Sequence, residues 1–177
     1  MKSELGLLLR ALAFAARKHR DQRRKDAHAS PYINHPIALA DVLVNEAGVT
    51  DVEVLCAALL HDTVEDTATT PEELLDGFGS RIARIVAEVT DDKSLSKEER
   101  KRLQIEHAQQ LSAEAKLVKL ADKICNLRDV AHHPPTGWDL ARRRGYFDWA
   151  KGVVDRLRGA HPGLEAAFDR AYSQRPE

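Results

Sequence analysis

The sequence contains no apolar run long enough to cross a bilayer, and it has only two cysteines. A spanning helix needs about 20 consecutive apolar residues, so we expect no membrane partner. The N-terminal leucines are interrupted by Arg10 and followed by Arg17-Lys18, which is not a signal-peptide pattern. Cys56 and Cys125 lie in apolar helical surroundings and are interpreted as free core thiols. Two unpaired cysteines without a secretory signal favour a cytoplasmic location.

The sequence also lacks an excess of charge of either sign. It has 27 lysines and arginines against 28 aspartates and glutamates, a formal net charge of −1. No basic field therefore indicates a nucleic-acid partner. Credible alternating strands, internal repeats and low-complexity tracts are missing as well, which argues against a β-rich or repeat architecture.

What the sequence does contain is helical periodicity along most of its 177 residues. The length fits one domain with a sizeable core. A capping box with proline in the first turn starts a short helix at 70–73. Apolar spacing and terminus signals predict the remaining helices over 5–19, 36–47, 51–61, 80–89, 97–109, 113–130, 139–158 and 163–172. We therefore expect an all-α fold, a single compact helical bundle spanning 1–177.

The most informative motif is His61-Asp62, which ends the apolar run 54–60. A carboxylate at the end of a buried helix costs several kcal/mol or more if nothing compensates its charge. A bound metal ion is a direct compensation, because it takes an imidazole nitrogen and a carboxylate oxygen as ligands. Two residues do not hold a catalytic metal alone, so further ligands are expected elsewhere.

His35 and Asp122 are the candidates for those ligands. His35 lies in the segment 31–36, just before a helix that Pro36 can open. Asp122 interrupts an otherwise apolar helical stretch. With His61 and Asp62 they make a set of two nitrogens and two carboxylates, which suits Mn²⁺ or Fe²⁺, with Zn²⁺ as a further candidate. No short spacing forces this grouping.

Glu65 and Asp66 follow the motif at a spacing of four residues. If the helix or its turn continues, Glu65 shares a face with His61, and Asp66 shares a face with Asp62. Carboxylates beside a metal are placed to remove a proton from water or to orient it. The alternative is a solvated acidic helix end, and the neighbouring His61-Asp62 favours the catalytic interpretation.

Asn126 stands one turn after Asp122 and has two interpretations. Its amide can satisfy itself on the helix backbone, or it can face the same cavity as Asp122 and bind a ribose or a phosphate. Tyr146 is either a core residue or a stacking surface, and Lys97 belongs either to a solvated helix face or to a phosphate site. The histidines in polar stretches are expected at the surface, namely His19, His28, His107 and His161.

Taken in order, these segments resemble a known family, the HD-domain alarmone hydrolases. These are the hydrolase domains of RelA/SpoT proteins and their small stand-alone relatives, the Mesh-type hydrolases. The resemblance is strongest over 14–150. The segments that carry it are 24–26, 31–36, 57–66, 88–93 and 116–123. One departure is visible: before Pro31 the family often has a glycine, where this chain has Ala29-Ser30.

The resemblance implies a specific activity, removal of the 3′-pyrophosphate of ppGpp and pppGpp, the nucleotides of the stringent response, with one Mn²⁺ ion. It implies His35, His61, Asp62 and Asp122 as metal ligands, and Glu65 and Asp66 as the pair that activates water. It also implies a set of nucleotide contacts, namely Arg24, Lys25, Asn126 and Tyr146, to which Lys97 is added as a candidate phosphate contact.

Two rival functions stay open at this point. One is an HD phosphohydrolase that acts on another nucleotide, such as the 2′-phosphate of NADPH. The other is a non-catalytic domain that senses a nucleotide, although a sensor needs no water-activating pair. The residues leave the oligomeric state open.

Overall fold

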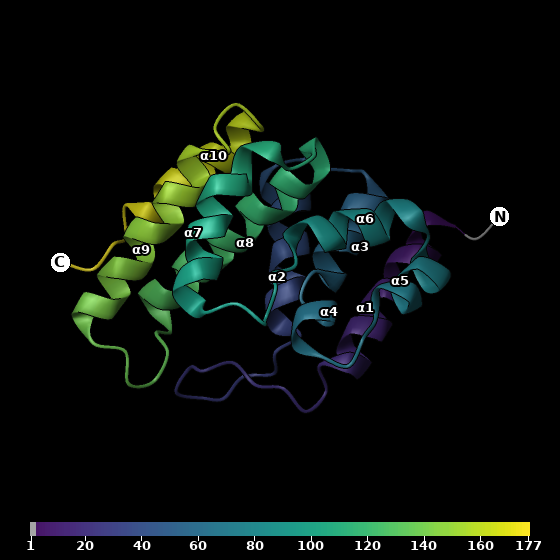
Figure 1. Ribbon diagram of the computed structural model, residues 1–177, viewed down its shortest axis with the longest axis horizontal. Coiled ribbons are helices and arrows are strands. Elements are labelled where there is room, and N and C mark those ends of the chain that lie inside the picture. The colour runs from purple at the N-terminus through teal and green to yellow at the C-terminus, as the bar shows by residue number, and fades with distance from the viewer. Residues whose placement is uncertain (1–2) are drawn as a thin grey trace.

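Helices make up most of the computed structural model, which describes residues 3–177 (Figure 1). Within that range no strand forms, and the one β-bridge pairs Arg23 with Pro31. The expected all-α fold is therefore confirmed. The α-helices are α1 (Glu4–Lys18), α2 (Asn34–Asp41), α3 (Val52–Leu60), α4 (Thr63–Asp66), α5 (Pro71–Phe78), α6 (Ser80–Val89), α7 (Lys97–His107), α8 (Ala113–His132), α9 (Leu140–Asp155) and α10 (Pro162–Tyr172).

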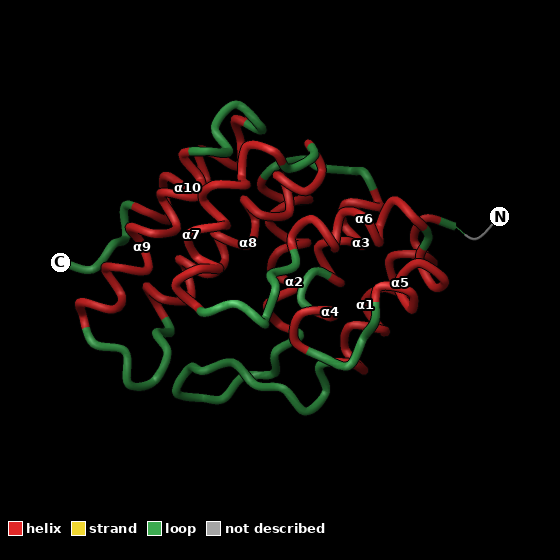
Figure 2. The backbone as a smooth tube through the Cα atoms, viewed as in Figure 1, coloured by secondary structure: helices red, strands yellow, loops and turns green. Residues whose placement is uncertain are grey.

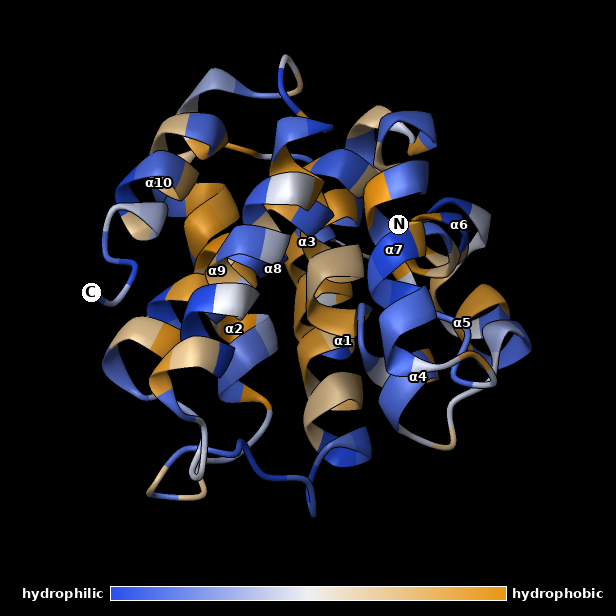
Figure 3. Ribbon diagram, turned by 60° about the vertical axis from the view of Figure 1, so that its left-hand side comes forward, coloured by the Kyte–Doolittle hydropathy of each residue, from blue (hydrophilic) through white to orange (hydrophobic). Residues whose placement is uncertain are grey.

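Helices α3 and α8 form the centre of the bundle. Every residue from Val54 to Leu60 in α3 is buried, because α1, α2, α6 and α8 all pack around it. Asp51 caps α3 by accepting hydrogen bonds from the backbone N–H groups of Glu53 and Val54. Helix α7 is the opposite case, since none of its residues is buried, and Figure 3 shows it as largely hydrophilic.

Two long loops lie along one edge of the molecule. One joins α1 to α2 and the other joins α8 to α9, and Figure 2 shows both at the lower edge of the view. They touch where the Thr136 backbone N–H donates to the Lys25 carbonyl at 2.8 Å. The α1–α2 loop thereby lies beside the end of α8, the helix that carries Asp122.

The helix ends differ from the sequence expectations in two places that affect the site. Helix α2 begins at Asn34, so Pro36 is its third residue and does not open the helix. It continues into a single π-helical turn, Val42–Glu46, before Gly48 turns the chain with a positive φ of 67°. Helix α3 ends at Leu60, one residue before the expected end at His61. No helix among the described residues is long and apolar enough to cross a membrane.

Candidate active site

His61 and Asp62 lie in the turn between α3 and α4. The Thr63 hydroxyl donates to the Leu60 carbonyl at 2.7 Å and stabilises this turn. The His61 ring is held by a hydrogen bond of 2.8 Å between Nδ1 and the carbonyl of Ala58. Because a carbonyl only accepts, Nδ1 carries the proton, and Nε2 of the neutral ring is left to bind a metal.

The four expected ligands converge from three helical segments. Atoms of His35, His61 and Asp62 lie within 4.8 Å of one another, close enough to hold one ion. Asp122 on α8 lies beside this group, with Oδ1 at 3.3 Å from His35 Nε2 and 4.0 Å from His61 Nε2. The structure thus brings together all four residues that the sequence singled out.

The chemistry of this set fits a divalent cation. Nε2 of His61 is buried and has no hydrogen-bond partner, although Oδ2 of Asp62 is only 3.0 Å away. Burial alone would lower the pKa of His61, but the Asp62 carboxylate outweighs it and raises this pKa to about 9. Burial likewise opposes ionisation of Asp122, yet the Lys123 ammonium holds the pKa of that carboxyl well below its usual range. The two partly buried carboxylates of Asp62 and Asp122 therefore favour a nearby positive charge, which a divalent ion supplies without a proton.

Glu65 and Asp66 lie beside the four expected ligands because they belong to the short helix α4, which follows the turn at His61-Asp62. The Asp66 backbone N–H donates to the Asp62 carbonyl at 2.9 Å, so Asp62, one of the four expected ligands, is the residue that precedes α4. The expected spacing of one turn therefore holds for this pair, although α3 has ended. Burial raises the pKa of Glu65, whose Oε2 accepts the backbone N–H of Asp91 at 3.1 Å. Lys93 Nζ lies 2.6 Å from Asp66 Oδ1 and 3.4 Å from Glu65 Oε1.

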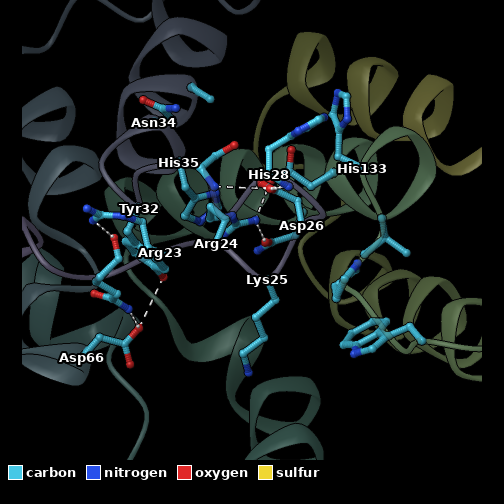
Figure 4. Close-up of a pocket in the computed structure, with 18 of the residues that line it drawn as sticks. Arg23, Arg24, Lys25, Asp26, His28, Tyr32, Asn34, His35, Asp66 and His133 are labelled. Carbon is cyan, nitrogen blue, oxygen red and sulfur yellow. Dashed lines mark hydrogen bonds and ion pairs between the residues drawn. The ribbon is translucent and has the colours of Figure 1, made fainter.

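A cavity of about 700 Å³ opens beside these carboxylates (Figure 4). A smaller cavity of about 200 Å³ surrounds the four ligands. Both cavities are lined by Arg24, Tyr32, His35, Glu65, Asp66, Asn126 and Tyr146. Lys25 lines the larger one. The four nucleotide contacts that the family resemblance implies therefore line one cavity, whereas the separately expected Lys97 does not. That lysine is exposed at the start of α7 and is not among the lining residues of either cavity.

Asn126 faces the cavity side of α8 and does not bond to its own helix backbone. Its Nδ2 donates to Asp122 Oδ1 at 2.5 Å, and its Oδ1 accepts from Arg24 Nη2 at 3.3 Å. Arg24 also pairs with Asp129, one helix turn further on. Of the two interpretations of Asn126, the structure favours the one in which its side chain shares a cavity with Asp122.

Tyr146 lines both cavities and lies close to two tryptophan rings. Its ring centroid lies 5.6 Å from that of Trp138 and 5.2 Å from that of Trp149. Burial raises the pKa of the Tyr146 hydroxyl. Tyr146 is therefore both a core residue and a ring available for stacking, because it packs against the core and also lines the cavity.

Several residues that touch the site were not expected from the sequence, among them Tyr32, Lys93 and Lys123. The Tyr32 hydroxyl donates a hydrogen bond to Asp62, and Lys93 pairs with both Glu65 and Asp66. Lys123 Nζ lies 3.0 Å from Asp122 Oδ2. Lys123 is 3% exposed and its ammonium lies 4.3 Å from the ring centroid of Trp149. A lysine within an apolar helical stretch is the one signal of this kind that the sequence offered. His19 was expected at the surface, but it is 2% exposed, because its ring stacks on Tyr32.

Comparison with known proteins assigns the chain to a family. The model of the HD domain family matches residues 11–145. The chain belongs to this family. It is 57% identical over 175 residues to the guanosine-3′,5′-bis(diphosphate) 3′-pyrophosphohydrolase MESH1 of Homo sapiens, covering 99% of this chain and 98% of that protein. The protein of the same name from Drosophila melanogaster is 54% identical over 167 residues, covering 94% of this chain and 93% of its own.

A solved structure extends the family match to three dimensions. It is described as a metazoan ortholog of SpoT that hydrolyses ppGpp and plays a role in starvation responses. It superposes on this chain with a TM-score of 0.93 at 53% identity, covering 96% of this chain and 95% of its own. The helices and the loops at the site therefore belong to a fold shared along almost the whole chain.

Proposed function

We propose that this protein hydrolyses the 3′-pyrophosphate of the alarmones ppGpp and pppGpp, giving GDP or GTP and diphosphate. The observation that carries the proposal is the convergence of His35, His61, Asp62 and Asp122 beside Glu65-Asp66 in one cavity. The relatives that match nearly end to end are named for this reaction. We also propose that the chain works as one hydrolase domain.

We assign the metal to the four converging ligands, and Mn²⁺ is the ion we favour for two imidazoles and two carboxylates. When bound, a divalent ion lowers the pKa of water and offsets charge on the attacked phosphate. His61 presents Nε2 because Ala58 holds its Nδ1 proton. Asp122 presents Oδ1, which also accepts from Asn126, while Lys123 pairs with Oδ2. These two ligands are thus oriented by a contact behind each of them.

Glu65 and Asp66 act on the attacking water. Water adds to the phosphorus next to the 3′ oxygen, the bond between that oxygen and phosphorus breaks, and diphosphate leaves. One proton is taken from water and one must reach the 3′ oxygen. Lys93 lies against both carboxylates and keeps their negative charge from repelling the anionic substrate.

The larger cavity receives the nucleotide. Arg24 is half-buried and held by Asp129 and Asn126, so its guanidinium is fixed at the cavity wall. Lys25 lines the same cavity from the α1–α2 loop, and Tyr146 offers an aromatic ring for stacking on the base or sugar. We include Lys97 as a phosphate contact that a long nucleotide reaches outside the cavity.

The experiment that tests the function is metal analysis of the purified protein together with a hydrolysis panel. The panel contains ppGpp, NADPH, GTP and deoxynucleotides, each with Mn²⁺ supplied. We expect kcat/KM to be highest for ppGpp, with diphosphate as a product. Activity on ppGpp no better than on GTP would reject alarmone hydrolysis as the main function. Higher activity on NADPH would assign the same metal site to a different phosphate ester.

A further inference from the structure

The hydroxyl of Tyr32 lies between two carboxylates that have different tasks. It donates to Oδ2 of Asp62 at 2.6 Å and lies 3.3 Å from Oδ2 of Asp66. Asp62 is a proposed metal ligand, and Asp66 is one of the proposed water-activating pair. The same Oδ2 of Asp62 is the atom 3.0 Å from His61 Nε2. One hydroxyl thus contacts the metal site and the catalytic pair together.

The ring of Tyr32 is fixed from two sides. His19, at the end of α1, stacks on it with a centroid distance of 4.8 Å and an interplanar angle of 30°. The Arg24 guanidinium lies 5.6 Å from the ring centroid. His19 is itself held, since its Nδ1 lies 2.6 Å from Oε1 of Gln22. Figure 4 shows Tyr32 and Asp66 on the same side of the cavity.

The Tyr32 hydroxyl is the donor toward both carboxylates. Carboxylate oxygens accept hydrogen bonds, so the single hydroxyl proton goes to them. The shorter contact is to Asp62, which makes that hydrogen bond the dominant one.

We propose that Tyr32 is a positioning residue: its hydroxyl fixes Asp62 as a metal ligand and sets the place of Asp66 relative to it. The proposal rests on the metal site and the reaction proposed above. Neighbouring Gln22 supports the second part, because its Nε2 donates to Asp66 Oδ2 at 3.3 Å. The α1–α2 loop therefore contacts both carboxylates, but only Tyr32 contacts Asp62.

The test is Tyr32→Phe, which removes the hydroxyl and keeps the ring that stacks on His19. Metal-free protein is titrated with Mn²⁺ in a calorimeter, and helix content is checked by circular dichroism. Loss of a hydrogen bond to a metal ligand typically costs about 10–100-fold in metal affinity or activity, so we expect the Kd for Mn²⁺ to rise by that factor. At saturating Mn²⁺ we expect kcat for ppGpp to fall while KM stays nearly constant, since Asp66 loses its alignment.

Two matched variants distinguish a specific effect of Tyr32 on Asp62 from a general loosening of the α1–α2 loop. Gln22→Leu removes a contact to Asp66 and the contact that holds His19, but no contact to Asp62, so it should lower kcat and weaken Mn²⁺ binding less than Tyr32→Phe does. Tyr172→Phe removes a hydroxyl that donates to the Asp148 carboxylate at 3.2 Å, far from the site, and should change neither quantity. A folded Tyr32→Phe protein that binds Mn²⁺ as tightly as the parent overturns the proposal. The proposal is also overturned if Gln22→Leu weakens Mn²⁺ binding as much as Tyr32→Phe does, because a loosened α1–α2 loop then explains the effect of both substitutions.

The metal readout needs no nucleotide. If the parent binds Mn²⁺ but does not cleave ppGpp, the proposed function fails, and the Mn²⁺ affinity of Tyr32→Phe still decides whether Tyr32 positions Asp62. If only KM changes in Tyr32→Phe, the residue binds substrate and the positioning role is wrong.

Discussion

Nε2 of His35 lies 3.3 Å from Oδ1 of Asp122, although the first residue is on α2 and the second is on α8. This contact brings His35 and Asp122 together beside His61 and Asp62, which completes the group of four proposed metal ligands. Helices α2 and α8 pack directly on each other, and α3 packs against both of them.

Removing a ligand should remove the metal and the activity together. We expect His61→Ala and Asp122→Ala to lose bound Mn²⁺ and all measurable ppGpp hydrolysis, as checked by metal analysis of the purified variants. Asp122→Ala should also unfold more easily, because it leaves the buried Lys123 without its carboxylate, and breaking such a pair costs roughly 3 kcal/mol. Metal binding by Asp122→Ala equal to that of the parent would show that the set of four ligands is wrong.

The carboxylate pair should affect chemistry and leave the metal in place. Glu65→Gln and Asp66→Asn are expected to retain Mn²⁺ and to lower kcat by about 10²–10⁴-fold, the usual contribution of a positioned acid or base. Metal content and steady-state kinetics are measured on the same samples. A change confined to KM would mean that the pair serves only binding.

Substrate contacts should act through KM. Arg24→Ala is expected to raise KM for ppGpp, because the contact is lost in the ground state and the transition state alike. Tyr146→Ala should raise it too, by the equivalent of about 1–3 kcal/mol for a lost stacking contact. Tyr146→Phe keeps the ring and is the control. Equal losses in Tyr146→Phe and Tyr146→Ala would assign the effect to the hydroxyl.

Ala29 should be replaceable by glycine with a gain in stability. Its φ of 48° lies in the left-handed region, where a Cβ is unfavourable and glycine is not. Part of that gain is offset by the greater entropy of glycine in the unfolded chain, which leaves about 0.5–1 kcal/mol in favour of Ala29→Gly. Chemical denaturation measures the difference. A less stable Ala29→Gly protein would show that this backbone conformation carries no strain.

The cap of α3 should make stability depend on pH. Hydrogen bonds from Arg81 lower the pKa of Asp51 below its ordinary value, so the pair contributes stability above the unfolded pKa of about 3.9. That contribution is lost as the pH falls through the lower, folded pKa. Arg81→Ala should therefore be less stable than the parent at pH 7, and the difference should narrow below about pH 4. A difference independent of pH would exclude the ion pair as its source.

Much of the fold follows from local patterns in the sequence. Apolar periodicity and caps located the helices, because a helix buries one face and satisfies its first N–H groups with nearby side chains. The apolar run 54–60 correctly predicted α3, and the capping box at 70–73 correctly predicted the start of α5. In that box Thr70 accepts a hydrogen bond from the backbone N–H of Glu73. Exact ends were harder, since the turn after Leu60 depends on a hydroxyl–carbonyl bond and not on periodicity.

The proposed metal ligands could be singled out as candidates from the sequence, because histidines and aspartates beside apolar segments need compensation wherever they are buried. Their mutual distances were decided only by how α2, α3 and α8 pack. The same holds for Tyr32, Lys93 and Lys123, whose contacts join segments that periodicity treats separately. Residue type and spacing determine which groups need a partner. Tertiary packing decides which partner each one has, because it alone brings distant segments within a few ångströms.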